Sequence, residues 1–310
     1  MPDKHNIKQA LNEREGFEVW WRLLRPHTLT ASFIPVFIGS MAALYMENTI
    51  NILLFLAMLV ASMLIQCATN MFNEYYDYVR GLDNEQSVGI GGTIVRDGIA
   101  PKTVLKLAFT FYGIAFLLGI YICMASSWWI AVIGLICMLF GYLYTGGPIP
   151  IAYTPLGELF SGFFMGTVII GISYYIQTFT LTADILLISI PVAIFIGCIM
   201  LANNIRDLDG DKENGRLTIA ILLGRQYAIV FLASLFLAAY AFTALFIVFE
   251  ILPYMSIIAF LSIPKAICVI KNFQGKSKPI EMLPAMIATG KTNTIYGFLI
   301  GLSLLISTWI

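Results

Sequence analysis

The amino-acid sequence predicts an all-α polytopic membrane protein, folded as a single bundle of about nine transmembrane helices. Of its 310 residues, 59% are hydrophobic and only 12% are charged, and the mean hydropathy is +0.85. A soluble domain has about 25% charged residues. Apolar stretches of about 20 residues, the length that spans a bilayer as a helix, recur along the whole chain. The sequence therefore favours one helical domain embedded in a lipid bilayer over a pair of soluble domains.

Nine apolar stretches are long enough to be predicted as spans. They cover residues 29–46, 51–72, 104–125, 128–145, 156–178, 184–203, 227–248, 251–271 and 291–310. Only Glu250 and Pro253 separate the seventh stretch from the eighth, so a count of eight remains the alternative. Residues 1–28 are predicted to form an amino-terminal segment at the cytoplasmic interface, with Trp20 and Trp21 as its anchor. Residues 29–310 form the predicted transmembrane domain.

The positions of the 18 Lys and Arg residues predict the orientation of the bundle. With nine spans, the amino terminus shares one side with the loops near residues 73–103, 146–155, 204–226 and 272–290, and the basic residues all fall on that side. The loops near residues 126, 180 and 250 contain none. Basic residues accumulate on the cytoplasmic side of membrane proteins. We therefore expect a cytoplasmic amino terminus, active-site loops on the same side, and no nucleic-acid partner.

Polar residues appear at the end of the second predicted span, where an apolar helix would otherwise continue. Asn73 and Asp77 are four residues apart and so share one face of a helix, and Asp83 follows six residues later. Because six residues do not continue that face, the chain must bend after the helix, and Gly81 is the predicted position. Ionisable groups at membrane depth are costly and mark functional sites.

The sixth predicted span ends with the same order of residues. Asn203 and Asp207 are again four apart, and Asp211 follows at helical spacing. A single pair of this kind is a weak signal, since solvated loops often carry surface ion pairs. Two copies predicted on the same membrane face indicate a shared site.

These two clusters predict a magnesium-dependent diphosphate site. Carboxylate and amide oxygens are hard ligands that suit Mg²⁺ or Mn²⁺, and no His or Cys lies near them to favour a softer metal. Asp77, Asp207 and Asp211 are the candidate catalytic residues. Basic side chains interleaved with the motifs are predicted to bind the diphosphate: Arg80, Arg96, Arg206, Lys212 and Arg216.

A diphosphate leaving at a membrane interface indicates a lipid-soluble donor, such as an allylic prenyl diphosphate. Its departure creates a carbocation, which aromatic faces stabilise. Tyr76, Tyr142 and Tyr144 lie near the predicted active face and are candidates for a prenyl or acceptor pocket, although packing or an interface belt explains such aromatic residues equally well.

On these residues the chain resembles the UbiA-type intramembrane prenyltransferases over nearly its whole length. In that superfamily, two Asp-rich motifs follow the second and sixth of nine helices and bind two magnesium ions and the prenyl diphosphate. The resemblance implies the same roles here, with the ligands Asn73, Asp77 and Asp83 in the first motif and Asn203, Asp207 and Asp211 in the second.

The R-T-x-x-R-P pattern of the hydroxybenzoate and haem-farnesylating branches is absent after the first motif. The chain instead reads Gly89-Ile-Gly-Gly-Thr-Ile-Val-Arg-Asp-Gly98, which is similar to the 1,4-dihydroxy-2-naphthoate polyprenyltransferases of menaquinone synthesis. The segments Arg25-Pro-His-Thr-Leu29, Tyr144-Thr-Gly-Gly-Pro148 and Asn203-Asn-Ile-Arg-Asp207 are similar too.

The resemblance implies polyprenyl transfer from polyprenyl diphosphate to 1,4-dihydroxy-2-naphthoate at the plasma membrane. The carboxylate is lost as carbon dioxide, and demethylmenaquinone is the product. Glu158, near the start of the fifth span, is a further candidate for the acceptor pocket. Two alternatives stay open: a different aromatic acceptor within the same superfamily, and, in another class, a secondary transporter, whose polar residues would lie nearer the midplane of the bilayer.

Overall fold

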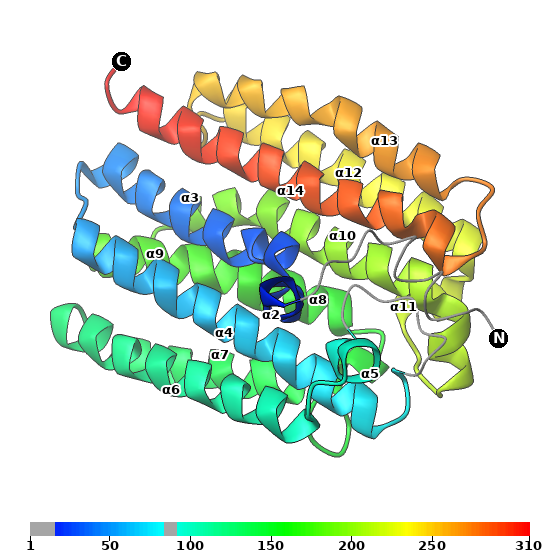
Figure 1. Ribbon diagram of the computed structural model, residues 1–310. Helices are drawn as coiled ribbons and strands as arrows, with labels where there is room; N and C mark the ends of the chain where they lie inside the picture. The colour runs from blue at the N-terminus through cyan, green and yellow to red at the C-terminus, as the bar shows by residue number, and fades with distance from the viewer. Residues whose placement is uncertain (1–15, 84–91) are drawn as a thin grey trace.

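The computed structural model describes residues 16–83 and 92–310, and over those residues it contains helices and no strand. The helices lie side by side along one direction and form a bundle (Figure 1). In chain order they are α2 (Phe17–Leu24), η1 (Pro26–Thr28), α3 (Thr30–Glu47), α4 (Ile52–Val79), α5 (Thr93–Asp97), α6 (Pro101–Ala125), α7 (Trp129–Leu143), η2 (Ile151–Tyr153), α8 (Gly157–Ser161), η3 (Gly162–Val168), α9 (Ile169–Thr178), α10 (Ala183–Glu213), α11 (Ile219–Leu223), α12 (Arg225–Val248), η4 (Tyr254–Ser262), α13 (Ile263–Phe273) and α14 (Pro279–Ser307).

The all-helical membrane fold is confirmed, and the predicted spans fall on these helices. Within the described part of the chain, seven helical segments are long and apolar enough to cross a membrane. α7 has 15 residues and is shorter than a standard span, and α14 contains Lys291 and Asn293. The predicted divide between the seventh and eighth spans is confirmed, because Glu250 takes a left-handed φ of 59° and Pro253 precedes η4. The count of nine is therefore approximate.

Two predicted spans end later than the sequence suggested. α4 continues from the apolar stretch to Val79, and α10 continues to Glu213. Asn73 and Asp77 therefore lie on α4, and Asn203, Asp207 and Asp211 lie on α10, whereas Asp83 follows the end of α4. The bend predicted at Gly81 is confirmed, since this residue follows α4 and has a φ of +76°, a conformation that glycine adopts without strain.

Glycines allow the helices in the middle of the bundle to approach closely. η3 is a turn of π-helix that continues into α9, and it packs against α10. A Cβ added at Gly166 would lie 2.6 Å from Cα of Ala193, and one at Gly162 would lie 2.5 Å from its carbonyl oxygen. Membrane helices associate through such small residues because lipid gives them no hydrophobic drive to pack.

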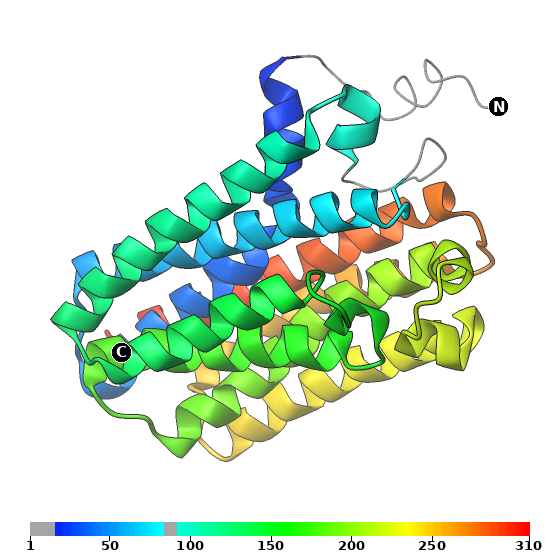
Figure 2. The ribbon, with the colours of Figure 1, turned by 90° about the horizontal axis from the view of Figure 1, so that it is seen from below.

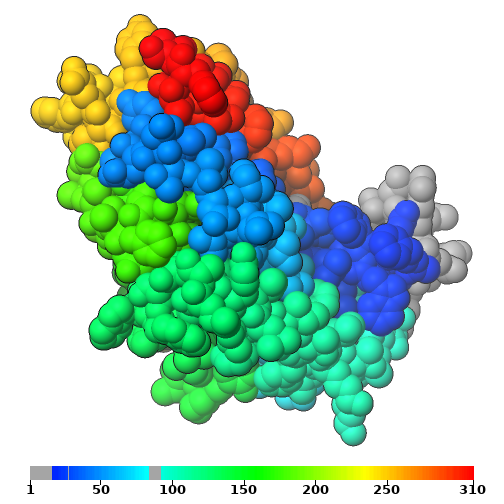
Figure 3. Space-filling view, turned by 90° about the vertical axis from the view of Figure 1, so that its left-hand side faces the viewer, coloured from blue at the N-terminus to red at the C-terminus, as the bar shows by residue number. Residues whose placement is uncertain are grey.

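α2 projects from the side of the bundle next to α5 (Figure 2 and Figure 3). Trp20 and Trp21 are exposed on it, whereas Leu23 is buried against α4. A short helix with one apolar exposed face and one packed face suits the membrane surface.

Candidate active site

The two polar motifs meet on one side of the bundle. α4 and α10 both end on the right-hand side of Figure 1, near α5 and α11. The link between them is Arg216, which follows α10. Its guanidinium donates to Oδ1 of Asp77 at 2.8 Å and to Oδ1 of Asp211 at 3.0 Å. One arginine therefore joins a carboxylate of the first motif to a carboxylate of the second.

This bridge is largely shielded from solvent, since the side chains of Asp77, Asp211 and Arg216 are 15%, 7% and 13% exposed. Burial lowers the pKa of Arg216, but the two carboxylates raise it above its ordinary value, so the guanidinium remains charged. Oδ2 of Asp211 is buried and accepts no hydrogen bond. An acceptor in that state is available for a further cation.

Asp83 and Asp207 lie close to the same cluster. The backbone N–H of Asp83 donates to the carbonyl of Asp77 at 3.2 Å, which holds the bend beside the helix end. Burial, and then the negative charge of Asp77, raises the pKa of Asp83 to about 6, and Asp207 adds to the shift. The side chain of Asp207 is 37% exposed and forms a 2.5 Å ion pair with its neighbour Arg206.

Like Arg216, the predicted diphosphate-binding residues Arg206 and Arg80 have partners in the protein. Nη1 of Arg206 lies 2.6 Å from the sulfur of Met286, so its guanidinium faces α14 as well as Asp207. Arg80 donates to the carbonyl of Thr145 and, at 2.9 Å, to that of Gly147. In this structure Arg80 thus holds the segment after α7.

The same segment is tied to the second motif. The backbone N–H of Leu217 donates to the carbonyl of Tyr153 at 2.9 Å. The guanidiniums of Arg80 and Arg216 both lie over the ring of Tyr153, at 5.4 Å and 5.0 Å from its centroid. Residues 144–154 are therefore held from both sides, by the end of α4 and by the chain that follows α10.

The remaining two basic candidates lie at the edge of the cluster. Lys212 is exposed on the last turn of α10, and Arg96 is half-buried on α5. Part of the glycine-rich stretch that supports the predicted role of Arg96, from Gly89 to residue 91, lies outside the described residues.

Two residues outside the predicted set of site residues complete the charged cluster, Arg25 and Glu74. Glu74 is fully buried on α4 and pairs with Arg25 at 3.6 Å. It also accepts from the hydroxyl of Thr93 and, at 3.1 Å, from the backbone N–H of Ile94. A buried carboxylate thus joins α4 to α5 and to the residue that ends α2. The costly position of Glu74 inside an apolar helix was the available signal.

A cavity of about 390 Å³ begins at these motifs and runs between the helices. Asn73 and Asn203, the first residues of the two motifs, both line it, as does Arg25. Away from them its lining is mostly apolar, with contributions from α4, α6, α7, η3 and α10. The arrangement is a polar end joined to an apolar interior.

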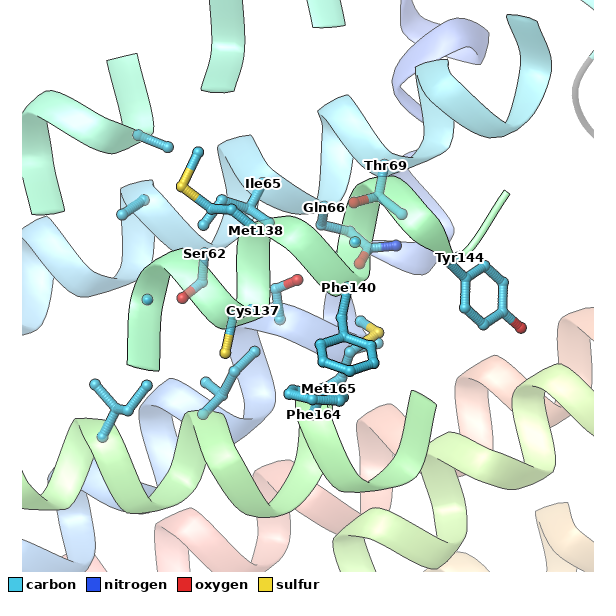
Figure 4. A pocket seen from close by; sticks show the side chains of 18 of the residues that line it. Ser62, Ile65, Gln66, Thr69, Cys137, Met138, Phe140, Tyr144, Phe164 and Met165 are labelled. Carbon is cyan, nitrogen blue, oxygen red and sulfur yellow. The ribbon is translucent and has the colours of Figure 1, made fainter. Parts of the chain in front are cut away.

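Of the four predicted pocket residues, Tyr144 lines the cavity, whereas Tyr76, Tyr142 and Glu158 do not. Figure 4 shows the ring of Tyr144 at one end of the view, beyond Phe140 and Phe164. Those two phenylalanines stack with centroids 4.5 Å apart. Tyr76 and Tyr142 share a 2.5 Å hydrogen bond between their hydroxyls. Glu158 is buried and accepts from Nδ2 of Asn204 at 2.8 Å, next to the second motif.

The donor set of the motifs fits a hard divalent cation, since it consists of carboxylates and amides. In the described ranges, no group of three His, Cys, Asp or Glu side chains lies close enough to hold an ion by itself. Arg216 occupies the space between Asp77 and Asp211, and Asn73 and Asn203 supply amide oxygens nearby. Mg²⁺ typically takes few protein carboxylates and completes its ligands with water and phosphate oxygens. The residues present therefore fit Mg²⁺ bound together with a diphosphate.

The fold and this site define a membrane-embedded helical protein with a charged polar end that opens into an apolar cavity. Residues 32–279 match the model of the UbiA prenyltransferase family. The chain belongs to that family.

The chain is 52% identical to the 1,4-dihydroxy-2-naphthoate octaprenyltransferase of Bacillus subtilis (strain 168). The match extends over 300 residues and covers 96% of this chain and 96% of the relative. The chain is 29% identical over 286 residues to the human UbiA prenyltransferase domain-containing protein 1, covering 88% of this chain and 79% of the human protein.

Solved structures share the fold at low sequence identity. A UbiA homolog from Aeropyrum pernix K1 superposes with a TM-score of 0.68 at 15% identity, covering 89% of this chain and 97% of that one. A UbiA homolog from Archaeoglobus fulgidus bound to GPP and Mg²⁺ gives 0.63 at 17% identity, covering 91% and 99%.

Proposed function

We propose that this protein is a 1,4-dihydroxy-2-naphthoate polyprenyltransferase. It transfers a polyprenyl group from polyprenyl diphosphate to the naphthoate, with loss of carbon dioxide, and yields demethylmenaquinone in its reduced, quinol form. The observation that carries the proposal is the meeting of Asn73 and Asn203 at the polar end of an apolar cavity, beside the Asp77–Arg216–Asp211 bridge. The relative from Bacillus subtilis, which is named for this activity, supports the choice of acceptor.

The two motifs are the proposed metal site. Asn73, Asp77 and Asp83 would hold one Mg²⁺ ion, and Asn203, Asp207 and Asp211 a second. When bound, the metal neutralises the charge on the departing diphosphate. The UbiA homolog from Archaeoglobus fulgidus, which is bound to GPP and Mg²⁺ in its structure, supports this assignment.

Cationic side chains are proposed to bind the diphosphate directly. Arg216 and Arg25 are placed best, because each is mostly buried beside the acidic cluster and carries a charge at the polar end. The others are the sequence candidates Arg80, Arg96, Arg206 and Lys212. For Arg80 and Arg206 the proposal requires the guanidinium to keep its present partners and to present its remaining N–H groups.

The proposed reaction requires three things of the protein: charged groups at the diphosphate, correct positioning of the two substrates, and exclusion of water. The apolar cavity takes the prenyl tail and excludes water from the allylic carbon, which the electron-rich ring attacks as the bond to diphosphate breaks. Aromatic rings that line the cavity, from Tyr144 and the Phe140–Phe164 pair, are proposed to stabilise the developing positive charge. Tyr76 and Tyr142 remain candidates from the sequence. Glu158 lies on the proposed acceptor side, next to Asn204.

We also propose the plasma membrane as the location, with the amino terminus and the active-site loops in the cytoplasm. The one-sided distribution of Lys and Arg supports this orientation. Three exposed tryptophans lie away from the motifs, as interface tryptophans would. Trp128 precedes α7, Trp129 is its first residue, and Trp309 follows α14. Residues 16–28 would lie on the cytoplasmic interface and 29–310 would form the membrane domain; the first 15 residues of the predicted amino-terminal segment lie outside the described residues.

One assay tests the activity and the acceptor together. Purified protein receives Mg²⁺, labelled polyprenyl diphosphate, and either 1,4-dihydroxy-2-naphthoate or 4-hydroxybenzoate. We expect a prenylated product and released carbon dioxide only with the naphthoate. Prenylated hydroxybenzoate would replace the proposed acceptor, and the absence of product with both would reject the proposed function.

A further inference from the structure

Two glycines line the apolar part of the cavity, Gly119 of α6 and Gly134 of α7. Gly119 lies six residues before the end of α6 at Ala125, and Gly134 lies five residues after the start of α7 at Trp129. Because the two helices run antiparallel from one short turn, the glycines stand at nearly the same depth in the bundle.

Their depth can be measured from the polar end. Gly141 of α7 lies beside Thr69 of α4, since a Cβ at Gly141 would stand 3.0 Å from the hydroxyl of Thr69. Thr69 is one helical turn below Asn73, about 6 Å at 1.5 Å per residue, and Gly134 is two turns below Gly141, about 10 Å. The glycine pair is therefore about 16 Å from the motif residues. Figure 4 shows Ser62 and Cys137 on the opposite side of the view from Tyr144.

Helix packing does not require these two glycines. A Cβ added at Gly119 or at Gly134 meets no atom within 4 Å, whereas one at Gly141 would come within 2.6 Å of the hydroxyl of Tyr112. Gly141 is thus a packing residue, and the pair borders open space. Ala115 and Cys123, one turn on either side of Gly119, also line the cavity. Gly119 therefore lies in the middle of the wall that α6 contributes.

We propose that Gly119 and Gly134 determine which lengths of isoprenoid chain this protein accepts. A side chain at either position would enter the apolar cavity at a fixed depth from the diphosphate end. It would obstruct a donor whose tail reaches that depth and leave room for a shorter one. The inference rests on the proposed function, because it takes the tail of the prenyl diphosphate as the occupant of this cavity.

The test compares two donors in three variants. Gly119→Leu and Gly134→Leu fill the wall, and Gly113→Leu is the matched control, because Gly113 also lies on α6, also borders open space, and does not line the cavity. Leucine is a better helix former than glycine, so none of the three weakens its helix. The measurement is kcat/KM for geranyl diphosphate and for octaprenyl diphosphate, with the naphthoate and Mg²⁺ held constant.

We expect the ratio of octaprenyl to geranyl kcat/KM to fall at least about tenfold in Gly119→Leu and Gly134→Leu, and to stay unchanged in Gly113→Leu. Activity with geranyl diphosphate in the same preparation shows that each variant is folded. Replacing Gly119 by Ala, Val and Leu in turn should lower the ratio stepwise. If the leucine variant does not fold, the alanine and valine variants provide the test. An unchanged ratio in this series, or an equal fall in the control, overturns the inference. The proposed function fails separately, if the unaltered protein uses neither donor.

Discussion

The guanidinium of Arg216 lies 2.8 Å from Oδ1 of Asp77, although 139 positions separate the two residues in the chain. The same guanidinium reaches Asp211, so it offsets repulsion between carboxylates that would otherwise face each other with little solvent. A cation that already stands between both motifs is well placed to meet the charge of a departing diphosphate. The relationship makes Arg216 the first residue to test.

We expect Arg216→Gln to lower kcat/KM about 10²- to 10³-fold, the usual cost of removing a group that stabilises charge in the transition state. Arg216→Lys should retain more activity, because lysine keeps the positive charge but cannot donate to both carboxylates from a planar guanidinium. Arg225→Gln is the control, since Arg225 pairs with the exposed Asp209 at 2.9 Å on the same side of the bundle. Steady-state kinetics of all three variants make the comparison, and a similar loss in Arg225→Gln would argue against a specific role.

Asp77→Asn and Asp211→Asn should each leave the protein folded in membranes but reduce activity by at least about 10²-fold. The reason is that an amide has no negative charge with which to hold Mg²⁺. Asp209→Asn is the matched control, because Asp209 belongs to the same helix end and its side chain is 65% exposed. The readout is activity across a Mg²⁺ titration; full activity in chelator, or in either motif variant, would refute the metal site.

Glu74→Gln should lower stability by about 1–3 kcal/mol, the cost of leaving a buried partner unsatisfied. The fully buried Glu74 carboxylate is the counter-charge of Arg25 and the acceptor for Thr93 and Ile94. The same change should raise KM for the prenyl diphosphate, because Arg25 loses its support. Thermal unfolding in detergent measures the first effect and kinetics the second. The exposed Glu213 supplies a control in Glu213→Gln, and an unchanged melting temperature in Glu74→Gln would contradict the role.

Gly166→Ala should destabilise the protein by about 1–3 kcal/mol, because its Cβ would lie 2.6 Å from Cα of Ala193, where neither backbone can give way easily. Gly113→Ala, where a Cβ meets open space, should be neutral or stabilising by about 0.5–1 kcal/mol. The melting temperatures of the two variants, measured in the same detergent, test this difference in stability. Equal values would show that η3 and α10 are less tightly packed than the structure indicates.

Local patterns predicted much of this fold. Apolar length located the spans, and the four-residue spacing of Asn73 and Asp77 placed them on one helix face, with the bend at Gly81. Apolar length alone put the ends of the two spans at residues 72 and 203, short of the helix ends at Val79 and Glu213, because polar residues end an apolar pattern without ending a helix. The helical spacing of the motif residues was the better guide.

Contacts between distant segments could not be read from the sequence. Arg25 and Glu74 were visible as charges, but their pairing depends on how α2 docks against α4. Arg80 was predicted as a diphosphate-binding residue from its charge, and only the structure shows that its guanidinium donates to the carbonyls of Thr145 and Gly147. The positions of charged residues in the sequence predict the kind of charge that a site carries. Tertiary packing determines which groups each charged side chain contacts.

The segment 144–154 is held by Arg80 on one side and, through Tyr153, by Leu217 on the other. It also begins with Tyr144, which borders the cavity. Any shift in the separation of the two motif helices must therefore move the wall against which the aromatic acceptor is proposed to rest. The two substrates would then not bind as independent events: occupancy by the lipid would alter the affinity for the ring compound, and by thermodynamic reciprocity the ring compound would alter the affinity for the lipid.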